Sequence, residues 1–513
     1  MPRWFNTAGP CNPDDHYMLP SVERLPSVKR LIEQSGYFVI HAPRQTGKTT
    51  AMLTLAQALT NEGEYAALMV SAEVGAAYTQ NLESTDAAIL RAWQDAAAFW
   101  LPSDSHPPDW SSLKSVGQAL SMWARESSKP IVLFIDEIDS LRDDALISVL
   151  RQLRDGYPRR PGGFPKSLAL IGLRDVRDYK AASGGSERLG TASPFNIKIE
   201  SLTLQNFTQA EVATLYQQHT TDTGQVFTTA AIEKAYDLTQ GQPWLVNALA
   251  RQMVEVLAPD PATSLTEEHV KQAKEILIQR RDTHLDSLAA RLREPRIRAI
   301  IEPMLAGQEL GDVPNEDIEF VLDLGLCVKS SQGGLVIANP IYKEVLPRVL
   351  SVVPSASLPQ IAPTWLTPEG KLDSEALLDA FLQFWRQHGE PLLKSAPYHE
   401  IAPHLVMMAF LHRVANGGGI LDREYALGMG RMDLCLRYGQ ETLAIELKVW
   451  REGRPDPLTR GLAQLDDYLG RLGLETGWLV IFDRREQLPP IEERTTTEVK
   501  ETPKGRSITV IRG

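Results

Sequence analysis

One ten-residue stretch, residues 41–50 with the sequence HAPRQTGKTT, limits what this chain can fold into more than any other feature. From position 42 it matches the pattern G-x-x-x-x-G-K-[ST], with Ala42 in place of the first glycine. A short β-prone run, residues 37–40, precedes it, and an apolar helical run, residues 51–56, follows it. Strand, tight loop and helix in this order form a cradle of backbone N–H groups for phosphate oxygens. The stretch therefore predicts a phosphate-binding loop in an α/β sheet.

The side chains of this stretch suit a nucleoside triphosphate. Lys48 is expected to reach the β and γ phosphates, and the Thr49 hydroxyl is expected to hold Mg²⁺. Ala42 is small, so we expect the loop to close without the usual glycine. A chance glycine turn before a helix is the alternative, which the completeness of the match disfavours. The residues expected to bind ATP here are Ala42, Pro43, Arg44, Gln45, Thr46, Gly47, Lys48, Thr49 and Thr50.

A second set of polar residues follows the apolar run at residues 131–135, IVLFI. Such a run predicts a buried parallel strand, and ligands of open α/β sheets bind at the C-terminal ends of strands. We expect Asp136 to hold Mg²⁺ and Glu137 to polarise the attacking water. The alternative is that these acids cap a helix. Asp139 is expected to cap the next helix.

Another buried strand is predicted at residues 168–173, and Arg174 follows it. Arg174 is a candidate sensor of the γ-phosphate, and a salt bridge to Asp175 or Asp178 is the alternative role.

Arg188 precedes a strand expected at residues 196–199, where an arginine finger can reach the nucleotide of a second copy of the chain. Arg159 and Arg160 compete for that role, and a solvated loop is the alternative for all three.

Several segments resemble AAA-type ATPases, in particular their archaeal-type and STAND-like branch, over residues 1–350. They are APRQTGKTT, IVLFIDEID, LIGLRD, SPFNIKIESLTLQNFT and GQPWLVNAL. The resemblance implies an ATPase core at residues 1–205 and a helical lid at 206–284. In that branch a G-x-P motif, here Gly241 and Pro243, opens a lid helix near the nucleotide and replaces the usual second sensor arginine.

Residues 285–350 resemble a winged helix, with a helix at 318–324 and a hairpin at 326–338. The segment is rich in acids, whereas phosphate backbones are bound by Lys and Arg, so a packing or partner role is favoured over DNA binding. The proline-rich residues 351–370 predict a linker.

The C-terminal region, residues 371–513, contains a predicted strand at 442–449 with Glu446 and Lys448. Side chains two apart on a strand share a face, and Asp433 on the preceding strand is expected to meet Glu446. Two carboxylates can hold Mg²⁺ together with water and a substrate phosphate. Lys448 would orient or deprotonate the attacking water. A surface hairpin with an ordinary Glu–Lys pair is the alternative.

This region resembles the PD-(D/E)XK nuclease superfamily, with Asp433, Glu446-x-Lys448, Gln464 in GLAQLDDYLG, and a following strand at 478–482. Met432 stands where the superfamily usually has proline, and Glu400 matches its helix-borne acid. The resemblance implies metal-dependent cleavage of nucleic acid, or the same fold as an inactive scaffold.

Composition sets limits on these interpretations. The 513 residues suggest several domains, and the net charge of −12 argues against a chain that is basic throughout. From residue 371 onward, 19 Lys and Arg face 21 Asp and Glu, so nucleic acid would meet less repulsion there. No apolar run reaches bilayer length and no signal-peptide pattern is present, which predicts a cytoplasmic protein without a membrane partner. Cys11, Cys327 and Cys435 predict neither disulfides nor a thiolate zinc site.

The sequence thus predicts an α/β chain with a P-loop AAA-type ATPase core, helical lid, winged helix and a C-terminal restriction-endonuclease-like domain. The predicted function is a switch that binds and hydrolyses ATP with Mg²⁺ and controls a metal-dependent nuclease in bacterial defence or mobile-element biology. Nucleic acid and a second copy of the chain are the predicted partners. The alternative is a nucleotide-dependent interaction protein with an inactive nuclease-like domain.

Overall fold

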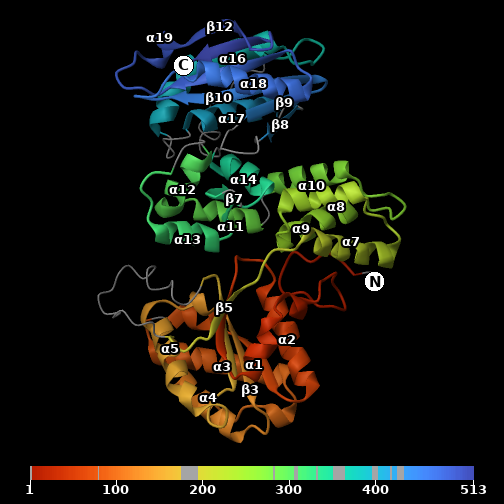
Figure 1. Cartoon of the computed structure of the whole chain (residues 1–513), viewed down its shortest axis with the longest axis vertical. Coiled ribbons are helices and arrows are strands. Elements are labelled where there is room, and N and C mark those ends of the chain that lie inside the picture. The colour runs from red at the N-terminus through yellow and green to blue at the C-terminus, as the bar shows by residue number, and fades with distance from the viewer. Residues whose placement is uncertain are drawn as a thin grey trace. The chain divides into compact units, whose positions relative to one another are not determined.

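The computed structural model describes residues 3–78, 80–174, 195–280, 283–305, 310–330, 333–350, 364–395, 402–415, 419–424 and 433–513. The chain divides into two compact units. The first comprises Met1–His284 and Glu319–Ile341, and the second comprises Leu285–Ile318 and Tyr342–Gly513. Figure 1 labels the elements of both.

The first unit is built on a five-stranded sheet in the order β2-β3-β4-β1-β5. All neighbouring strands run parallel, which confirms the predicted α/β class. The strands are β1 (Tyr37–His41), β2 (Ala66–Ser71), β3 (Ile131–Asp136), β4 (Ser167–Gly172) and β5 (Glu200–Thr203).

The expected strand at residues 196–199 is wrong by four positions. Residues 195–197 form a turn, and the strand that pairs with β1 is β5. Pairing with β1 begins where Ile199 N donates to Tyr37 O at 2.7 Å, and Phe195 of the preceding turn is buried in the core.

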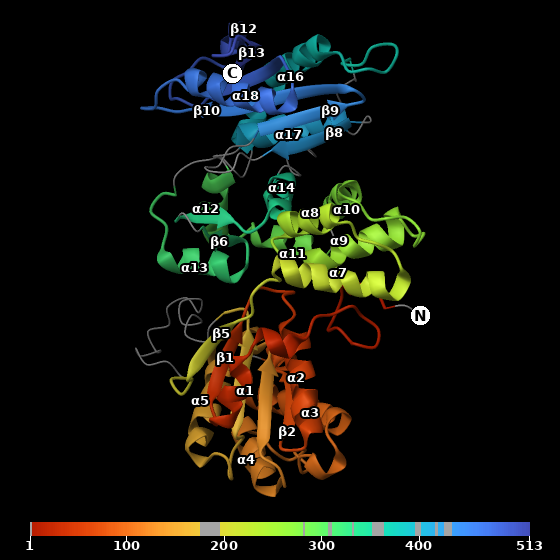
Figure 2. The ribbon, with the colours of Figure 1, turned by 45° about the vertical axis from the view of Figure 1, so that its right-hand side comes forward.

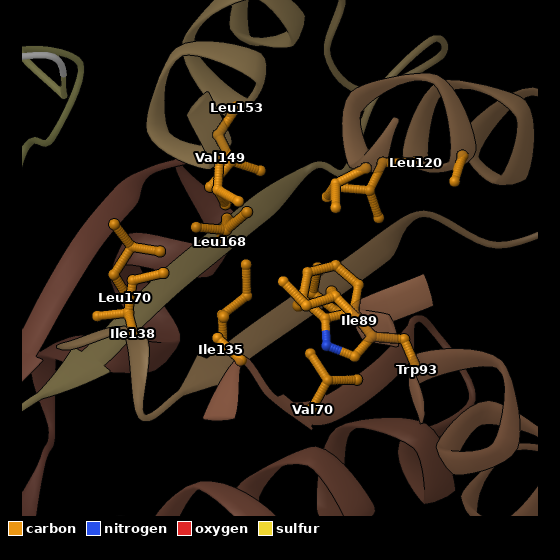
Figure 3. Packing of buried hydrophobic residues seen from close by; sticks show 14 of the residues in the cluster. Val70, Ile89, Trp93, Leu120, Ile135, Ile138, Val149, Leu153, Leu168 and Leu170 are labelled. Carbon is orange, nitrogen blue, oxygen red and sulfur yellow. The ribbon is translucent and has the colours of Figure 1, made fainter. Parts of the chain in front are cut away.

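Helices cover both faces of this sheet, which is why its central strands read as continuous apolar runs. Alternate strand residues, among them Val70, Ile135 and Leu168, pack against α3 (Leu82–Trp100), α4 (Val116–Glu126) and α5 (Asp143–Gly156), as Figure 3 shows. The residues between them face α1 (Ser27–Glu33) and α2 (Lys48–Glu62). The sheet is therefore held from both sides, and its strand ends are fixed in place.

Four helices follow β5 in the first unit: α7 (Gln209–Thr223), α8 (Thr229–Thr239), α9 (Pro243–Gln252) and α10 (Glu267–Arg280). A capping box opens α7, with Thr208 and Glu211 bonding each other's backbone N–H. The helix that the G-x-P motif opens is α-helical to Gln252, and a π-helical turn, Met253–Leu257, continues it. Residues 3–18 are fastened to this helical part by the rings of Phe5 and Tyr17, which contact Tyr216 and His219.

The helix and the hairpin expected at residues 318–324 and 326–338 lie among the elements that the structure forms in residues 285–350, but the division between the two units runs through this range. The winged-helix domain therefore stays a prediction. The elements are α11 (Thr283–Arg291), α12 (Pro295–Leu305), α13 (Asn315–Asp323), the hairpin of β6 (Cys327–Lys329) and β7 (Leu335–Ile337), and α14 (Pro340–Leu350).

The second unit contains a six-stranded sheet in the order β12-β13-β11-β10-β9-β8. The strands β10, β11 and β13 run parallel, and β8, β9 and β12 are antiparallel to their neighbours. The strands are β8 (Gly419–Glu424), β9 (Asp433–Tyr438), β10 (Glu441–Trp450), β11 (Thr476–Asp483), β12 (Thr496–Glu501) and β13 (Ser507–Arg512).

Helices cover both faces of this second sheet as well. The amphipathic α18 (Leu458–Leu472) lies beside β10 (Figures 1 and 2). Leu465 and Leu469 of α18 belong to one buried cluster with Ala444 of β10 and Leu479 of β11. On the other face Trp385 of α16 (Ser374–Ser395) contacts Phe482. The described helices of this unit also include α17 (Ala402–Ala415), which is almost wholly buried, and the short α19 (Ile491–Arg494).

Among the described residues, no helix combines the length and apolar character that crossing a membrane would require.

Candidate functional site

The loop at residues 42–47 joins β1 to α2, as its sequence predicts. Gly47 is the N-cap of α2 with φ of 90°, and Gln45 also takes a positive φ of 59°. The Thr46 hydroxyl donates to Pro43 O at 2.9 Å and closes the loop on itself. The first N–H groups of α2 thus stand at the C-terminal edge of the sheet, where anions bind to helix N-termini.

Ala42 is compatible with this loop for a local reason. Its backbone lies outside the left-handed region, so the position does not require glycine. Its methyl group is buried in the core between the sheet and α2.

Lys48 is held by the loop itself. Its Nζ donates to the carbonyl oxygens of Ala42 and Pro43 at 2.8 and 2.9 Å. Burial lowers the pKa of Lys48, and the charges of Asp136, Asp139 and Glu137 act in the opposite direction. The ammonium group is therefore placed inside the loop, where the phosphates would lie.

Thr49 and Asp136 meet although 87 residues separate them. The Thr49 hydroxyl donates to Asp136 Oδ2 at 2.7 Å, and Glu137 N donates to Asp136 Oδ1 at 2.9 Å. Burial raises the pKa of Asp136, and the hydrogen bond from Thr49 opposes that rise. A hydroxyl and a carboxylate side by side are hard oxygen donors, so these two residues fit Mg²⁺.

Glu137 has an unusual backbone conformation. Its φ is 52°, in the left-handed region that non-glycine residues seldom occupy and that is enriched at functional sites. Burial raises the pKa of the Glu137 carboxyl, and the neighbouring charges of Asp139 and Asp136 raise it further. The carboxyl of Glu137 thus stands at the end of β3, directly after Asp136.

The expectation that Asp139 caps the next helix is wrong. The next α-helix, α5, has Arg142 as its N-cap, and no side chain caps it. Asp139 Oδ2 instead accepts from Leu173 N at 3.3 Å, which ties the end of β3 to the end of β4. No local pattern indicated this contact, because it joins two strands 34 residues apart.

Arg174 forms an ion pair that the sequence did not suggest. Its Nε donates to Asp323 Oδ2 at 2.9 Å, while Asp175 and Asp178 lie outside the described residues.

The finger candidates stand as follows. Arg188 also lies outside the described residues. Arg159 pairs with Asp155 at 2.8 Å, and Arg160 lies over the Tyr157 ring.

The G-x-P motif brings its middle residue to the loop. Gly241 has φ of 69°, and a Cβ there would lie 1.8 Å from Phe207 O, so only glycine fits. Pro243 is the first residue of α9, and Gln242 caps that helix through Leu245 N. Gln242 Nε2 also donates to Gln45 O at 3.4 Å. Gln242 is therefore a loop contact that the motif, read through its glycine and proline, did not reveal.

Thr50 connects the loop helix to the N-terminal arm. Its hydroxyl oxygen accepts from Cys11 N at 3.0 Å. The arm also reaches α9, because Trp244 Nε1 donates to Thr7 O at 2.9 Å. The N-terminal residues 7–11 thus contact both the first turn of α2 and the helix α9.

A separate acid–lysine arrangement lies in the second unit. Glu446 is fully buried on β10, and Lys448 Nζ donates to Glu446 Oε1. The antiparallel register pairs Asp433 of β9 with Glu446, as expected for the hairpin. The structure describes the backbone of Asp433 but not its side chain. Gln464 lies on α18, which covers this face of β10, and its Oε1 atom is buried without a hydrogen-bond partner among the described residues.

The described residues do not complete a metal site in this second arrangement. Glu400 precedes the start of α17 at Ala402 and lies outside the described residues. Within the described ranges, no three His, Cys, Asp or Glu side chains are grouped so that they could hold a metal ion. Glu446 is thus the one predicted metal ligand of this site whose side chain the structure describes.

No protein-family model matches the sequence, and no curated protein matches it. Among solved structures, the chain is similar to a Walker-type ATPase of Pyrococcus abyssi, with 14% identity and a TM-score of 0.48 over 67% of this chain and 99% of that one. The RuvB Holliday junction branch migration motor of Thermotoga maritima has 15% identity and a TM-score of 0.33 over 63% and 92%. Cdc6p of Pyrobaculum aerophilum has 12% identity and a TM-score of 0.34 over 64% and 92%. The geometry of the site, rather than these distant similarities, is the basis for assigning a function.

Proposed function

We propose that the first unit binds and hydrolyses ATP. The observation that carries this proposal is the hydrogen bond between Thr49 and Asp136, which joins the first turn of α2 to the end of β3. A hydroxyl and a carboxylate at this point, beside the Lys48 ammonium, are the groups that a magnesium-bound triphosphate needs.

Each residue has a separate task in this proposal. The N–H groups of the loop and Lys48 bind the β and γ phosphates, and Thr49 and Asp136 hold Mg²⁺. When bound, Mg²⁺ neutralises charge on the phosphate oxygens. Glu137 accepts a proton from the attacking water, a task for which its raised pKa suits it.

The test is the Lys48→Ala variant. It should lose tight binding of a fluorescent ATP analogue in the presence of Mg²⁺, because the loop loses its side-chain cation. The matched control is Lys29→Ala, which removes an exposed lysine of the same unit that pairs only at the surface with Glu62, at 2.8 Å. ATP affinity that is equal in all three proteins would contradict the proposal.

For the second unit, we propose a metal-dependent nuclease whose activity the nucleotide state of the first unit controls. Support comes from Glu446 and Lys448 on one face of β10, from the register that pairs Asp433 with Glu446, and from Gln464 on the covering helix. Glu446 and Asp433 would hold the metal, and Lys448 would orient the attacking water.

A second candidate for this unit is an inactive scaffold. The observation that favours it is the ion pair itself, because Lys448 already neutralises Glu446. A buried carboxylate that a lysine already neutralises needs no metal, so the fold can serve in protein contacts without one.

One experiment separates the two candidates. The full-length protein is incubated with single- and double-stranded DNA and RNA, with and without ATP and with Mg²⁺ or Mn²⁺. The nuclease proposal expects metal-dependent cleavage that Asp433→Asn abolishes while ATP hydrolysis continues. The melting temperature is also measured with and without Mg²⁺, and the nuclease proposal expects a rise that Asp433→Asn weakens. If no substrate is cleaved and Mg²⁺ does not raise the melting temperature of the wild-type protein, the scaffold is supported instead.

A further inference from the structure

The ion pair at the end of β4 is enclosed on two sides. Arg174 is 5% exposed, its Nε lies 2.9 Å from Asp323 Oδ2, and its guanidinium carbon lies 4.5 Å from the centre of the Phe320 ring. Asp323 and Phe320 both belong to the last turns of α13. A single helix end therefore provides both the carboxylate and the aromatic face that hold this guanidinium.

The same helix end contacts the phosphate-binding loop. We call the segment from Phe320 to Gly325 the α13 corner. Gly325 has φ of 71°, and a Cβ on it would lie 2.7 Å from both Cβ and Cγ of Pro43. The backbone of the corner thus lies directly on the loop, and a side chain at this position would separate the two.

Arg174 itself is placed beside the loop by β4. Two residues before it, Gly172 O accepts from Ala42 N at 3.4 Å, and Leu173 N donates to Asp139. The strand end is therefore fixed from both sides, while the long Arg174 side chain has rotatable bonds. A guanidinium keeps its charge at every physiological pH and pairs with whichever anion is placed best.

We propose that Asp323 is a positioning residue that holds Arg174 against the α13 corner, and that the γ-phosphate of ATP competes with Asp323 for the same guanidinium. The inference rests on the proposed ATP binding. ADP has no γ-phosphate and does not compete. Binding of ATP therefore weakens the hold of the corner on Arg174, and by reciprocity the corner lowers affinity for ATP but not for ADP.

The test is Asp323→Asn in the full chain, since the amide keeps the shape of the side chain and removes its charge. The dissociation constants for Mg²⁺–ATP and Mg²⁺–ADP are measured side by side. The expected result is ATP binding that is tighter by about fivefold or more, with ADP binding unchanged. Asp323→Glu, which restores the charge, should return the ratio of the two constants toward the wild-type value.

Two further variants make the test specific. Glu319→Gln removes the other acid of α13 with a described ion pair, an exposed one to Lys329 at 3.2 Å, and should leave the ATP-to-ADP ratio unchanged. Gly325→Ala adds the Cβ that collides with Pro43 and should shift the ratio in the same direction as Asp323→Asn. It also serves as the test if Asp323→Asn fails to fold.

The outcomes are distinct. Three results in a folded Asp323→Asn or Gly325→Ala protein would each overturn the inference alone. They are an equal change in affinity for ATP and ADP, weaker binding of ATP, and an unchanged ratio of the two dissociation constants. A wild-type protein that binds neither nucleotide overturns the proposed ATPase function and this inference with it.

Discussion

Each unit places a lysine close to an acid, but the two units arrange the charges differently. In the first unit Asp136 bonds the neutral hydroxyl of Thr49, while Lys48 bonds the loop carbonyls. In the second unit Lys448 bonds Glu446 on the same strand. A phosphate and a metal can therefore enter the first site without disturbing an ion pair, whereas a metal on Glu446 would share that carboxylate with Lys448. The same residue types are thus prepared for ligands in the first site and paired with each other in the second.

The largest expected effect tests whether the first site performs chemistry as well as binding. Glu137→Gln should keep ATP affinity and lower kcat by about 10²- to 10⁴-fold, because the amide has the same shape but cannot act as a base. Phosphate release measures turnover, and equilibrium titration measures affinity. Hydrolysis at the wild-type rate would show that another residue positions the water.

The next effect concerns the neutralised pair. Lys448→Met should lower the free energy of unfolding of the second unit by about 3 kcal/mol, because the buried Glu446 carboxylate loses the Lys448 ammonium. Denaturant unfolding followed by tryptophan fluorescence measures the change. The double variant Lys448→Met/Glu446→Gln is the control and should recover much of the loss. Equal losses in the single and double variants would mean that the ion pair is not the cause.

The smallest effect concerns Ala42, the departure from the loop pattern. Ala42→Gly should leave ATP affinity unchanged and lower stability by about 1 kcal/mol, since the buried methyl is lost and the backbone gains freedom in the unfolded state. Thermal melting with and without ATP measures both quantities. A marked gain in ATP affinity would show that the alanine restricts the loop. The loop of the first site would then not be in its binding conformation before the nucleotide arrives.

Local patterns predicted the elements that carry the first site. β1, the loop, α2 and the acids after β3 follow one another within short windows, and apolar runs buried on both faces are easily recognised. The pairing of Arg174 with Asp323 joins residues 149 positions apart, so no window contains it. The contact of Gln242 with the loop was not predicted, and Asp139 was expected to cap a helix, for the same reason: their contacts depend on how strands and helices pack. The start of β5 was misplaced by four residues, because residues 197–203 carry no local signal for where pairing with β1 begins.

The left-handed backbone of Glu137 has a consequence for how this sequence would respond to selection. A glutamate in that conformation costs the folded state about 1 kcal/mol relative to a residue that tolerates it, such as asparagine. A library screened only for thermal tolerance should therefore enrich asparagine at position 137 and yield sturdier proteins that no longer turn over ATP. Retention of glutamate there would have to be enforced by a screen for activity, since folding alone works against it.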